Sequence, residues 1–160
     1  MNRNGHKPSV VIVDDEDMVI TSIKAFLQLE TDYNIRGFTD PVEAADYASQ
    51  NPVDVVVSDY LMPKLNGIQL LGKIKAAQPE TSRVLLTGHA DKQSAIQAIN
   101  EVALFQYLEK PWDNSQLLLV VQSGAERSRL LRDLREKVEE LDSANSTLKG
   151  VQRRLIEAFL

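Results

Sequence analysis

The chain has 160 residues, of which 43% are hydrophobic, and a formal net charge of −5 at pH 7. This length suits one domain with an additional segment, and the acidic balance argues against nucleic-acid binding by this chain. The absence of cysteine excludes disulfides and thiolate metal sites, and no apolar stretch is long enough to span a membrane. The polar start, residues 1–8, is expected to be a flexible tail and not a signal peptide, which favours a cytoplasmic location.

Short apolar segments alternate with segments of helical periodicity along the next hundred residues. The predicted strands are Ser9 to Val13, Tyr33 to Phe38, Val55 to Asp59, Arg83 to Thr87 and Phe105 to Leu108. The predicted helices run from Val19 to about Glu30, Pro41 to about Asn51, Ile68 to Ala77, Asp91 to about Val102, and onward from a cap at Asp113. This alternation predicts an α/β fold with a five-stranded doubly wound parallel sheet of order 2-1-3-4-5, the flavodoxin-like arrangement.

The stretch from Asp54 to Gly67 is the most informative part of the sequence. Val55, Val56 and Val57 predict a strand that is buried on both faces. Asp59 ends this strand, at the edge of the sheet where open α/β folds place their ligands. A charge directly after an apolar strand needs a partner.

In the predicted strand order, the carboxyl ends of neighbouring strands bring Asp14, Asp15, Thr87 and Lys110 to Asp59. Three carboxylates repel one another, and a divalent cation relieves that conflict; oxygen ligands with room for water suit Mg²⁺. Lys110 supplies a cation and Thr87 a hydroxyl donor. The expected chemistry is attack by Asp59 on a phosphoryl group, which forms an aspartyl phosphate.

Four motifs in this order resemble the receiver domain of two-component response regulators. They are Val10-Val-Ile-Val-Asp-Asp-Glu16, Val56-Val-Ser-Asp-Tyr-Leu-Met-Pro63 with Asn66-Gly67, Leu85-Leu-Thr-Gly88, and Tyr107-Leu-Glu-Lys-Pro111. The resemblance implies that Asp59 accepts a phosphoryl group from a histidine kinase. It implies that Asp14, Asp15 and the backbone carbonyl of Leu61 hold Mg²⁺ with Asp59.

The resemblance also implies a switch. Thr87 and Tyr107 would be the switch pair, Lys110 would bind the phosphoryl group, and the Lys110-Pro111 bond would be cis. The output would be reached through the fourth helix, fifth strand and fifth helix. Leu61 and His89 occupy positions that tune phosphoryl lifetime in the family, and Gly88 replaces the alanine that the family often has after the threonine.

A second function class is a magnesium-dependent phosphohydrolase that acts through an aspartyl phosphate. Such an enzyme usually needs a second acid two residues after the nucleophile to protonate the leaving group. Leu61 occupies that position and cannot do so. The sequence therefore favours a signalling switch over an enzyme with an external substrate.

After about residue 126 the composition changes to charges separated by single leucines. Leu131, Val138, Asn145, Gln152 and Phe159 are seven apart, as are Leu134, Leu141, Leu148 and Leu155 in a second row. These heptads predict a parallel homodimeric coiled coil whose seam is formed by Leu131, Leu134, Val138, Leu141, Asn145, Leu148 and Leu155. We expect a receiver domain at 9–126, a coil at 127–160, and a missing C-terminal output domain such as a cyclic-di-GMP enzyme or histidine kinase.

Overall fold

The computed structural model describes the backbone of residues 5–159 and the side chains of residues 5–158. The strands are β1 (Ser9–Val13), β2 (Asn34–Phe38), β3 (Val55–Asp59), β4 (Ser82–Thr87) and β5 (Gln106–Glu109). The helices are α1 (Asp17–Glu30), α2 (Pro41–Gln50), α3 (Gly67–Ala77), α4 (Lys92–Glu101) and α5 (Asn114–Phe159), with a 3-10 turn, η1 (His89–Asp91), before α4. The expected tail covers residues 1–8, and its first four residues lie outside the described part of the chain.

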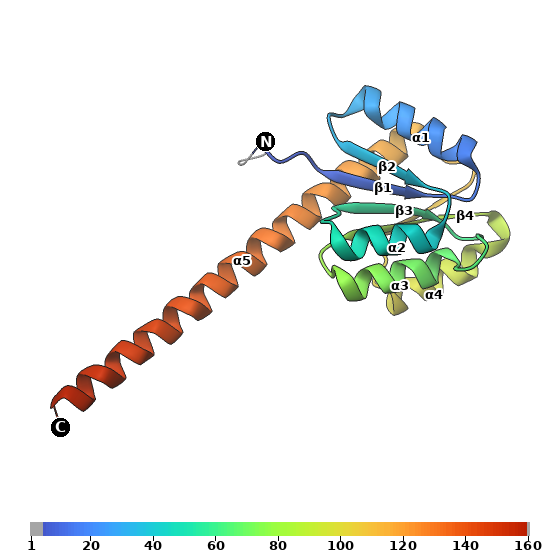
Figure 1. Ribbon diagram of the computed structural model, residues 1–160. Coiled ribbons are helices and arrows are strands. Elements are labelled where there is room, and N and C mark those ends of the chain that lie inside the picture. Colours follow the sequence, from blue (N-terminus) through green and yellow to red (C-terminus); the bar gives the residue numbers. More distant parts are fainter. Residues whose placement is uncertain (1–4, 160) are drawn as a thin grey trace. The chain divides into compact units, whose positions relative to one another are not determined.

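All five strands are parallel, and their order in the sheet is β2-β1-β3-β4-β5. Helix α1 and the first part of α5 cover one face of the sheet, and α2, α3 and α4 cover the other (Figure 1). The predicted fold class and strand order are confirmed. The carboxyl ends of β1, β3, β4 and β5 therefore meet at one edge.

The central strands supply both halves of the hydrophobic core. Val55 and Val57 pack in the cluster beneath α1 and α5, whereas Val56 packs in the cluster beneath α2, α3 and α4. All three side chains are fully buried. A strand covered on both faces favours consecutive β-branched residues over alternation, as the sequence indicated.

Side-chain caps fix the starts of α2, α3 and α5. Asp40 and Asp113 each accept a hydrogen bond from the backbone N–H two residues further on, at 2.9 Å and 2.8 Å. Asn66, which the sequence marked only as part of a turn, forms a capping box with Gln69 at the start of α3. Each cap satisfies N–H groups that have no partner inside the helix.

Several predicted boundaries, among them those of β5 and α4, are shifted by one or two residues. β5 was expected at Phe105 to Leu108, but Glu109 pairs with Thr87 and extends the strand by one residue at its carboxyl end. Phe105 lies before the strand, although its N–H bonds to the Arg83 carbonyl at 2.8 Å. Helix α4 begins at Lys92 and not at the residue before it, because the chain first makes the η1 turn.

A buried arginine holds two loops at the amino-terminal edge of the sheet. Arg83, on β4, is only 2% exposed. Its guanidinium donates to the carbonyls of Pro79, Thr81, Val102 and Ala103 at 2.9–3.2 Å. These four bonds tie the α3–β4 connection to the α4–β5 connection, and they replace the carboxylate partner that a buried charge normally requires.

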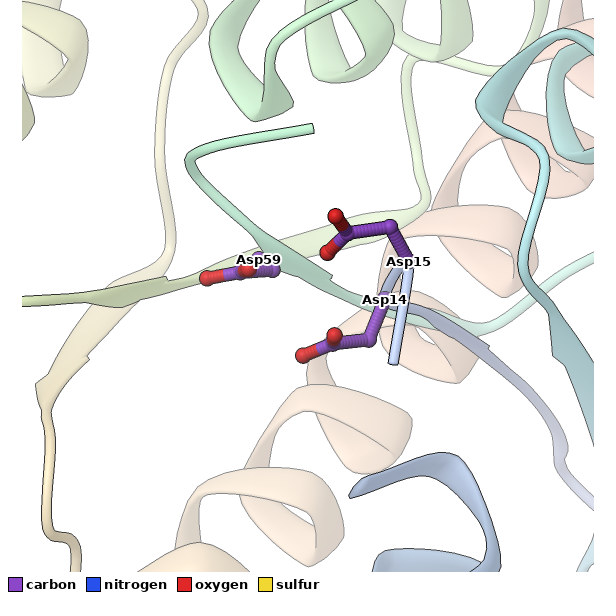
Figure 2. A group of neighbouring side chains, drawn as sticks. All are labelled: Asp14, Asp15 and Asp59. Atoms are coloured by element: carbon purple, nitrogen blue, oxygen red, sulfur yellow. The ribbon is translucent and has the colours of Figure 1, made fainter. Parts of the chain in front are cut away.

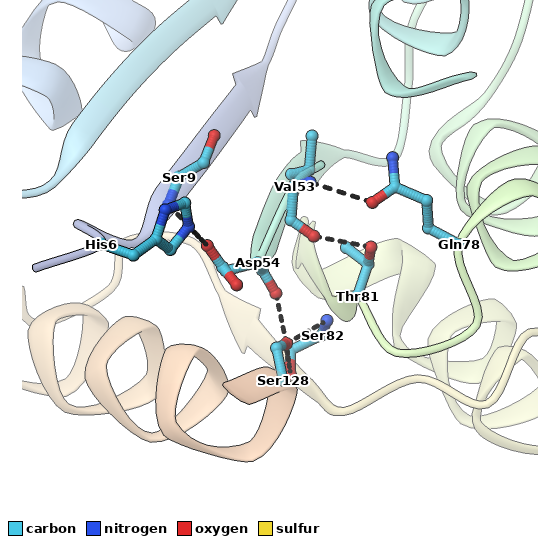
Figure 3. A network of polar contacts seen from close by, with 8 residues as sticks. All are labelled: His6, Ser9, Val53, Asp54, Gln78, Thr81, Ser82 and Ser128. Carbon is cyan, nitrogen blue, oxygen red and sulfur yellow. Dashed lines mark hydrogen bonds and ion pairs between the residues drawn. The ribbon is translucent and has the colours of Figure 1, made fainter. Parts of the chain in front are cut away.

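A second polar network joins the same edge to α5. The Asp54 carboxylate accepts from the Ser9 N–H at 2.7 Å, while its carbonyl accepts from the Ser128 hydroxyl at 2.5 Å (Figure 3). Ser128 Oγ also accepts from the Ser82 N–H at 3.1 Å, and the Ser82 hydroxyl donates to the Gly124 carbonyl at 2.7 Å. Helix α5 is thereby fastened at Ser128 to β4 and to the residue that precedes β3.

Helix α5 has 46 residues and extends through two compact units, residues 1–128 and Arg129–Leu160. The expectation that the fifth helix continues without a break is confirmed. Its second part carries ion pairs one turn apart, between Arg129 and Asp133 at 3.5 Å and between Arg135 and Glu139 at 3.9 Å. Within the described residues, neither this helix nor any other has an apolar stretch sufficient to cross a membrane.

Candidate functional site

Three carboxylates meet at the carboxyl ends of β1 and β3. Asp14 and Asp15 follow β1, Asp59 ends β3, and the two strands are neighbours in register, with Val13 beside Ser58. Each of the three residues offers an oxygen within 4.8 Å of the others, and Figure 2 shows the side chains on the same side of the strand ends. Asp14 and Asp59 are buried and Asp15 is exposed. The structure therefore brings together the acids that the sequence predicted.

Lys110 reaches this cluster from the end of β5. Its Nζ lies 2.8 Å from Asp59 Oδ1, and the same oxygen accepts from the Tyr60 N–H at 3.0 Å. Burial acts to lower the pKa of Lys110, but the bond to Asp59 and the negative charges of Asp59, Asp14 and Glu16 together raise it above the usual value. The Lys110-Pro111 peptide is cis, as expected. Lys110 is therefore a charged ammonium group in contact with the candidate nucleophile.

Asp14 is the carboxylate of this cluster whose ionised form is disfavoured by its surroundings. Burial, opposed by a hydrogen bond from the Glu16 N–H and reinforced by the charge of Asp59, raises the pKa of Asp14 to about 6. Its Oδ1 accepts that N–H at 2.8 Å, whereas its Oδ2 is a buried oxygen for which the described residues provide no hydrogen-bond partner. A buried carboxylate oxygen without a donor is costly, and a cation removes the cost.

The donor set fits Mg²⁺. The residues available are three carboxylates, with hard oxygen donors, and one of the oxygens lacks a partner in the described structure. Mg²⁺ prefers oxygen ligands and commonly binds through one or two carboxylates while keeping several waters. The exposure of Asp15 leaves one side of the cluster open to water. The acidic cluster therefore fits Mg²⁺ both in its donor chemistry and in its access to water.

The other predicted site residues lie on β4, on β5 and in the segment after β3. Thr87 is fully buried, and its hydroxyl donates to the Leu108 carbonyl at 3.5 Å, the outer limit of a hydrogen bond. Tyr107 is half-buried against the cluster beneath α2, α3 and α4. Leu61, whose carbonyl is the expected additional ligand, has an exposed side chain.

His89 lies in η1 with its side chain exposed, and its Nδ1 is 2.6 Å from Glu109 Oε1. Sequence reasoning missed Glu109, because it gave this residue no role between the switch tyrosine and Lys110. The pair connects the turn after β4 with the end of β5. A signal was present in hindsight: His89 and Glu109 follow neighbouring strands, whose ends meet at this edge.

Gly67 is a further residue that the site requires. An added Cβ would overlap the backbone carbonyl of Asp59, and it would lie 2.7 Å from Leu85 Cδ1. The Gly67 N–H donates to the Tyr60 carbonyl at 2.8 Å, so the start of α3 is held against the turn that carries the nucleophile. The sequence marked Asn66-Gly67 as a turn but not as a close approach to Asp59.

The predicted seam residues lie along the second unit. Leu134, Val138, Leu141, Leu148 and Leu155 are exposed, with 48–69% of each side chain accessible in the single chain. Leu131 is half-buried and Asn145 is exposed. The side chain of Phe159, which the heptad pattern also includes, lies outside the described residues.

The known proteins that this chain resembles include response regulators and their receiver domains. A family model for the response regulator receiver domain matches residues 10–122. The chain is 27% identical over 141 residues to the hydrogenase transcriptional regulatory protein HoxA of Cupriavidus necator, and the match covers 88% of this chain and 29% of that protein. It is 25% identical over 160 residues to the transcriptional regulatory protein FixJ of Bradyrhizobium diazoefficiens, and the match covers 100% of this chain and 76% of that protein.

Solved structures agree with these matches. The signal receiver domain of an HD domain-containing protein from Pseudomonas fluorescens has a TM-score of 0.76 and 29% identity, and the match covers 83% of this chain and 97% of that one. A receiver domain protein from Clostridium thermocellum has a TM-score of 0.72 and 31% identity, covering 78% and 98%. The chain spans about three tenths of the length of the longer curated relatives, 29% for HoxA and 30% for the C4-dicarboxylate transport regulator DctD of Rhizobium meliloti.

Proposed function

Because this chain belongs to the response regulator receiver domain family, we propose that Asp59 is its phosphoacceptor. Members of this family are switches that respond to phosphorylation in two-component systems. The observation that carries the assignment is the position of Asp59 between two further carboxylates and the Lys110 ammonium group, 2.8 Å away. Asp59 is the one member of this acidic cluster that the described structure pairs with a lysine.

The transfer step starts from the Asp59 carboxylate. Its Oδ1 already accepts from Lys110 and Tyr60, so we assign the attack to Oδ2. That oxygen forms a bond to phosphorus while the bond from phosphorus to the donor breaks, and the donor leaves with the electron pair. With a histidine kinase, the donor atom is a nitrogen of its phosphohistidine. The product is an acyl phosphate on Asp59.

The charges in the pocket explain how the chain handles the added group. The Lys110 side chain is flexible, so its ammonium group can move from Asp59 Oδ1 to a nearby phosphoryl oxygen. Mg²⁺, when bound, supplies positive charge that offsets the carboxylates and the phosphoryl oxygens. Asp14, Asp15, Asp59 and the Leu61 carbonyl are the groups that would hold it.

Thr87 is the proposed sensor of the phosphoryl group. Within the described residues its hydroxyl bonds at 3.5 Å to the Leu108 carbonyl, so little interaction energy opposes its rotation toward a better acceptor. Movement of Thr87 would free space near Tyr107 on the neighbouring strand and let that ring turn inward. Helix α4, β5 and α5 form the surface that would report the change. Leu61 and His89 are the positions proposed to set the phosphoryl lifetime.

The phosphohydrolase alternative gains no support from the site. Leu61 stands where a general acid would be needed, and its hydrocarbon side chain cannot donate a proton. Receiver domains are signalling switches, and the proposed catalysis is limited to phosphorylation and dephosphorylation of the chain itself. Multiple-turnover release of phosphate from small phosphate esters would contradict this.

The proposed partners are a histidine kinase and a second copy of this chain. We retain the assignment of residues 9–126 as the receiver domain and 127–160 as a parallel coiled coil that connects to an output module. A cyclic-di-GMP enzyme or a histidine kinase were the expected outputs. The matched relatives include named transcriptional regulators and an HD domain-containing protein, so their names favour no single class. A cytoplasmic location stays a prediction.

The phosphoacceptor is tested with Asp59→Asn. The amide keeps an acceptor for the Tyr60 N–H, so the variant should fold, yet it should gain no phosphoryl group from acetyl phosphate, as measured by intact mass spectrometry. Asp54→Asn is the matched control, because Asp54 is a buried carboxylate that directly precedes the strand that Asp59 ends. It should be phosphorylated like the parent chain. Full phosphorylation of the Asp59 variant would remove Asp59 from the proposal.

A further inference from the structure

Three parallel rows of residues lie along the second unit, and they are the basis of an inference that depends on the proposed coiled-coil dimer. The middle row, the leucine row, is Leu134, Leu141, Leu148 and Leu155. The a row precedes it by three residues and contains Leu131, Val138, Asn145 and Gln152. The g row follows it by three residues and contains Leu130, Lys137, Ala144, Val151 and Ala158. Residues three apart differ by about 60° around a helix, so the a and g rows flank the leucine row on opposite sides.

The polarity of the two flanking rows reverses along the helix. In the first half, the a row is apolar with Leu131 and Val138, while the g row contains Lys137. In the second half, the a row becomes polar with Asn145 and Gln152, and the g row becomes entirely apolar. A dimer seam needs apolar residues in two adjacent rows. No single pair of rows meets that requirement from Leu131 to Ala158.

We propose that a second copy of this chain packs in parallel along residues 129–158, and that the seam changes sides at Ala144. Before Ala144 the seam combines the leucine row with the a row; after it, the seam combines the leucine row with the g row. The core residues at the change are Val138, Leu141 and Ala144, with two successive intervals of three. Such a three-residue insertion is a stammer, which tightens the supercoil locally.

The exposed side chains support a second copy as the partner. Leu148, Val151 and Leu155 are 62%, 45% and 54% exposed and form one continuous stripe in the second half of the helix. In the first half, Lys137 can reach Asp142 of a second copy only when the two helices run parallel. The attraction between these two opposite charges favours a copy of this chain over an unrelated apolar partner.

Gly150 lies six residues after the proposed change of seam. No heavy atom comes within 4 Å of the place that its Cβ would occupy, so packing within the chain does not require glycine there. Glycine is the least restrictive residue for the helix backbone, and it eases a local change of twist. Because the leucine row belongs to both seams, the helices can pass from one to the other while every leucine remains in the core.

The change of seam determines how the helix pair is presented to whatever follows it. The centre of the seam moves by about 60° around each helix compared with a continuous heptad seam. An attached module would therefore meet its symmetry mate through a different face. A signal that tightened or relaxed the supercoil at Ala144 would alter this presentation without separating the two chains.

The chain has no cysteine, which makes disulfide trapping a direct test. Single cysteines are placed in the full chain at Val151 and Gln152, and at Leu130 and Leu131 as reference positions in the first half. Paired core positions of a parallel coil face each other within reach of a disulfide, so Val151→Cys should cross-link at least about fivefold faster than Gln152→Cys. Leu131→Cys should cross-link faster than Leu130→Cys, since the a row forms the seam there.

The outcomes separate this inference from the dimer on which it rests. Faster cross-linking of Gln152→Cys, or equal rates for the two, would overturn the change of seam and leave the parallel dimer in place. A dimer by light scattering in which Leu131→Cys fails to cross-link would indicate antiparallel helices and overturn the inference. A monomer would overturn the proposed dimer as well, while the assignment of Asp59 would stand.

A matched pair of substitutions provides a second measurement. Val151 and Ile156 are both β-branched and exposed, but Ile156 lies outside the proposed seam. Val151→Ser should shift the dimer toward monomer in light scattering, and Ile156→Ser should leave it unchanged. The opposite result would place the seam on the other side of Leu155 and refute the inference.

Discussion

Replacing Asp14 by asparagine should stabilise the unphosphorylated, magnesium-free protein. Asp14 is 1% exposed, and its Oδ2 has no donor among the described residues. Burial and the neighbouring Asp59 charge disfavour the ionised form and raise the pKa of Asp14 from 3.8 to about 6. Asparagine removes the buried charge and keeps an acceptor for the Glu16 N–H. The substitution therefore removes an unfavourable interaction without leaving that backbone donor unpaired.

The magnitude follows from the pKa difference of about 2 units between folded and unfolded states. At about 1.4 kcal/mol per unit, the ionised carboxylate destabilises the fold by about 3 kcal/mol at pH 7. Since the folded pKa lies above the unfolded one, the penalty is absent below pH 3.8 and grows as pH rises to about 6. At pH 4.5 it should be only about 1 kcal/mol.

The assay is urea unfolding of both proteins from pH 4.5 to pH 8 in the presence of a chelator. The variant should exceed the parent by about 3 kcal/mol at neutral pH, and the gap should shrink toward about 1 kcal/mol at pH 4.5. Asp15→Asn is the control, because Asp15 is exposed and a surface substitution should change stability by less than about 0.5 kcal/mol. A gap for the Asp14 variant that does not change with pH, or a loss of stability at pH 7, would refute the reasoning.

Three further predictions concern the metal, the glycines and the buried arginine. Asp15→Ala should weaken Mg²⁺ binding by at least about tenfold in calorimetry, and an unchanged affinity would contradict its role as a ligand. Gly124→Ala, whose Cβ would lie 3.1 Å from Ser82 Cβ, should lower the unfolding free energy by about 1–3 kcal/mol. Gly150→Ala is the matched control, because the space around its Cβ is open, and it should raise helix stability by about 0.5–1 kcal/mol. If the two glycine variants changed the unfolding free energy equally, close packing at Gly124 would be contradicted. Arg83→Lys keeps the charge but cannot reach four carbonyls, and chemical unfolding should show a loss of about 3 kcal/mol; a loss below about 1 kcal/mol would show that the four bonds matter little.

The grouping of the acidic cluster with Lys110 was predictable because the positions of these residues follow from a simple rule. Buried runs such as Val55 to Val57 identify strands, alternation with helices makes the strands parallel, and parallel strands bring their carboxyl ends together. Asp14, Asp59 and Lys110 then share an edge without any knowledge of side-chain geometry. The pattern predicted this grouping because position along the strand is enough to place these residues at the same edge.

The amino-terminal edge was not predictable in the same way. Arg83 binds only backbone carbonyls, which every residue possesses, so its partners have no signature in the sequence. Ser128 bonds to a carbonyl 74 residues away. Nothing in the helical pattern around this serine indicates that its hydroxyl has a distant partner. The start of β5 was displaced by one residue because Phe105 and Leu108 are both apolar and a four-residue strand offers little periodicity to choose between registers.

The hydroxyl of Ser128 has a consequence for how such chains can be recombined. A natural or engineered fusion made upstream of this residue would remove the hydroxyl that gives the Asp54 carbonyl and the Ser82 N–H a second hydrogen bond each, besides the 2.8 Å bond that these two backbone groups make with each other. The tie between α5 and this end of the sheet would be lost with it. A junction made after it would retain every one of these bonds, whatever sequence came next. Ser128 therefore marks the earliest junction that keeps α5 bonded to β4 and to Asp54.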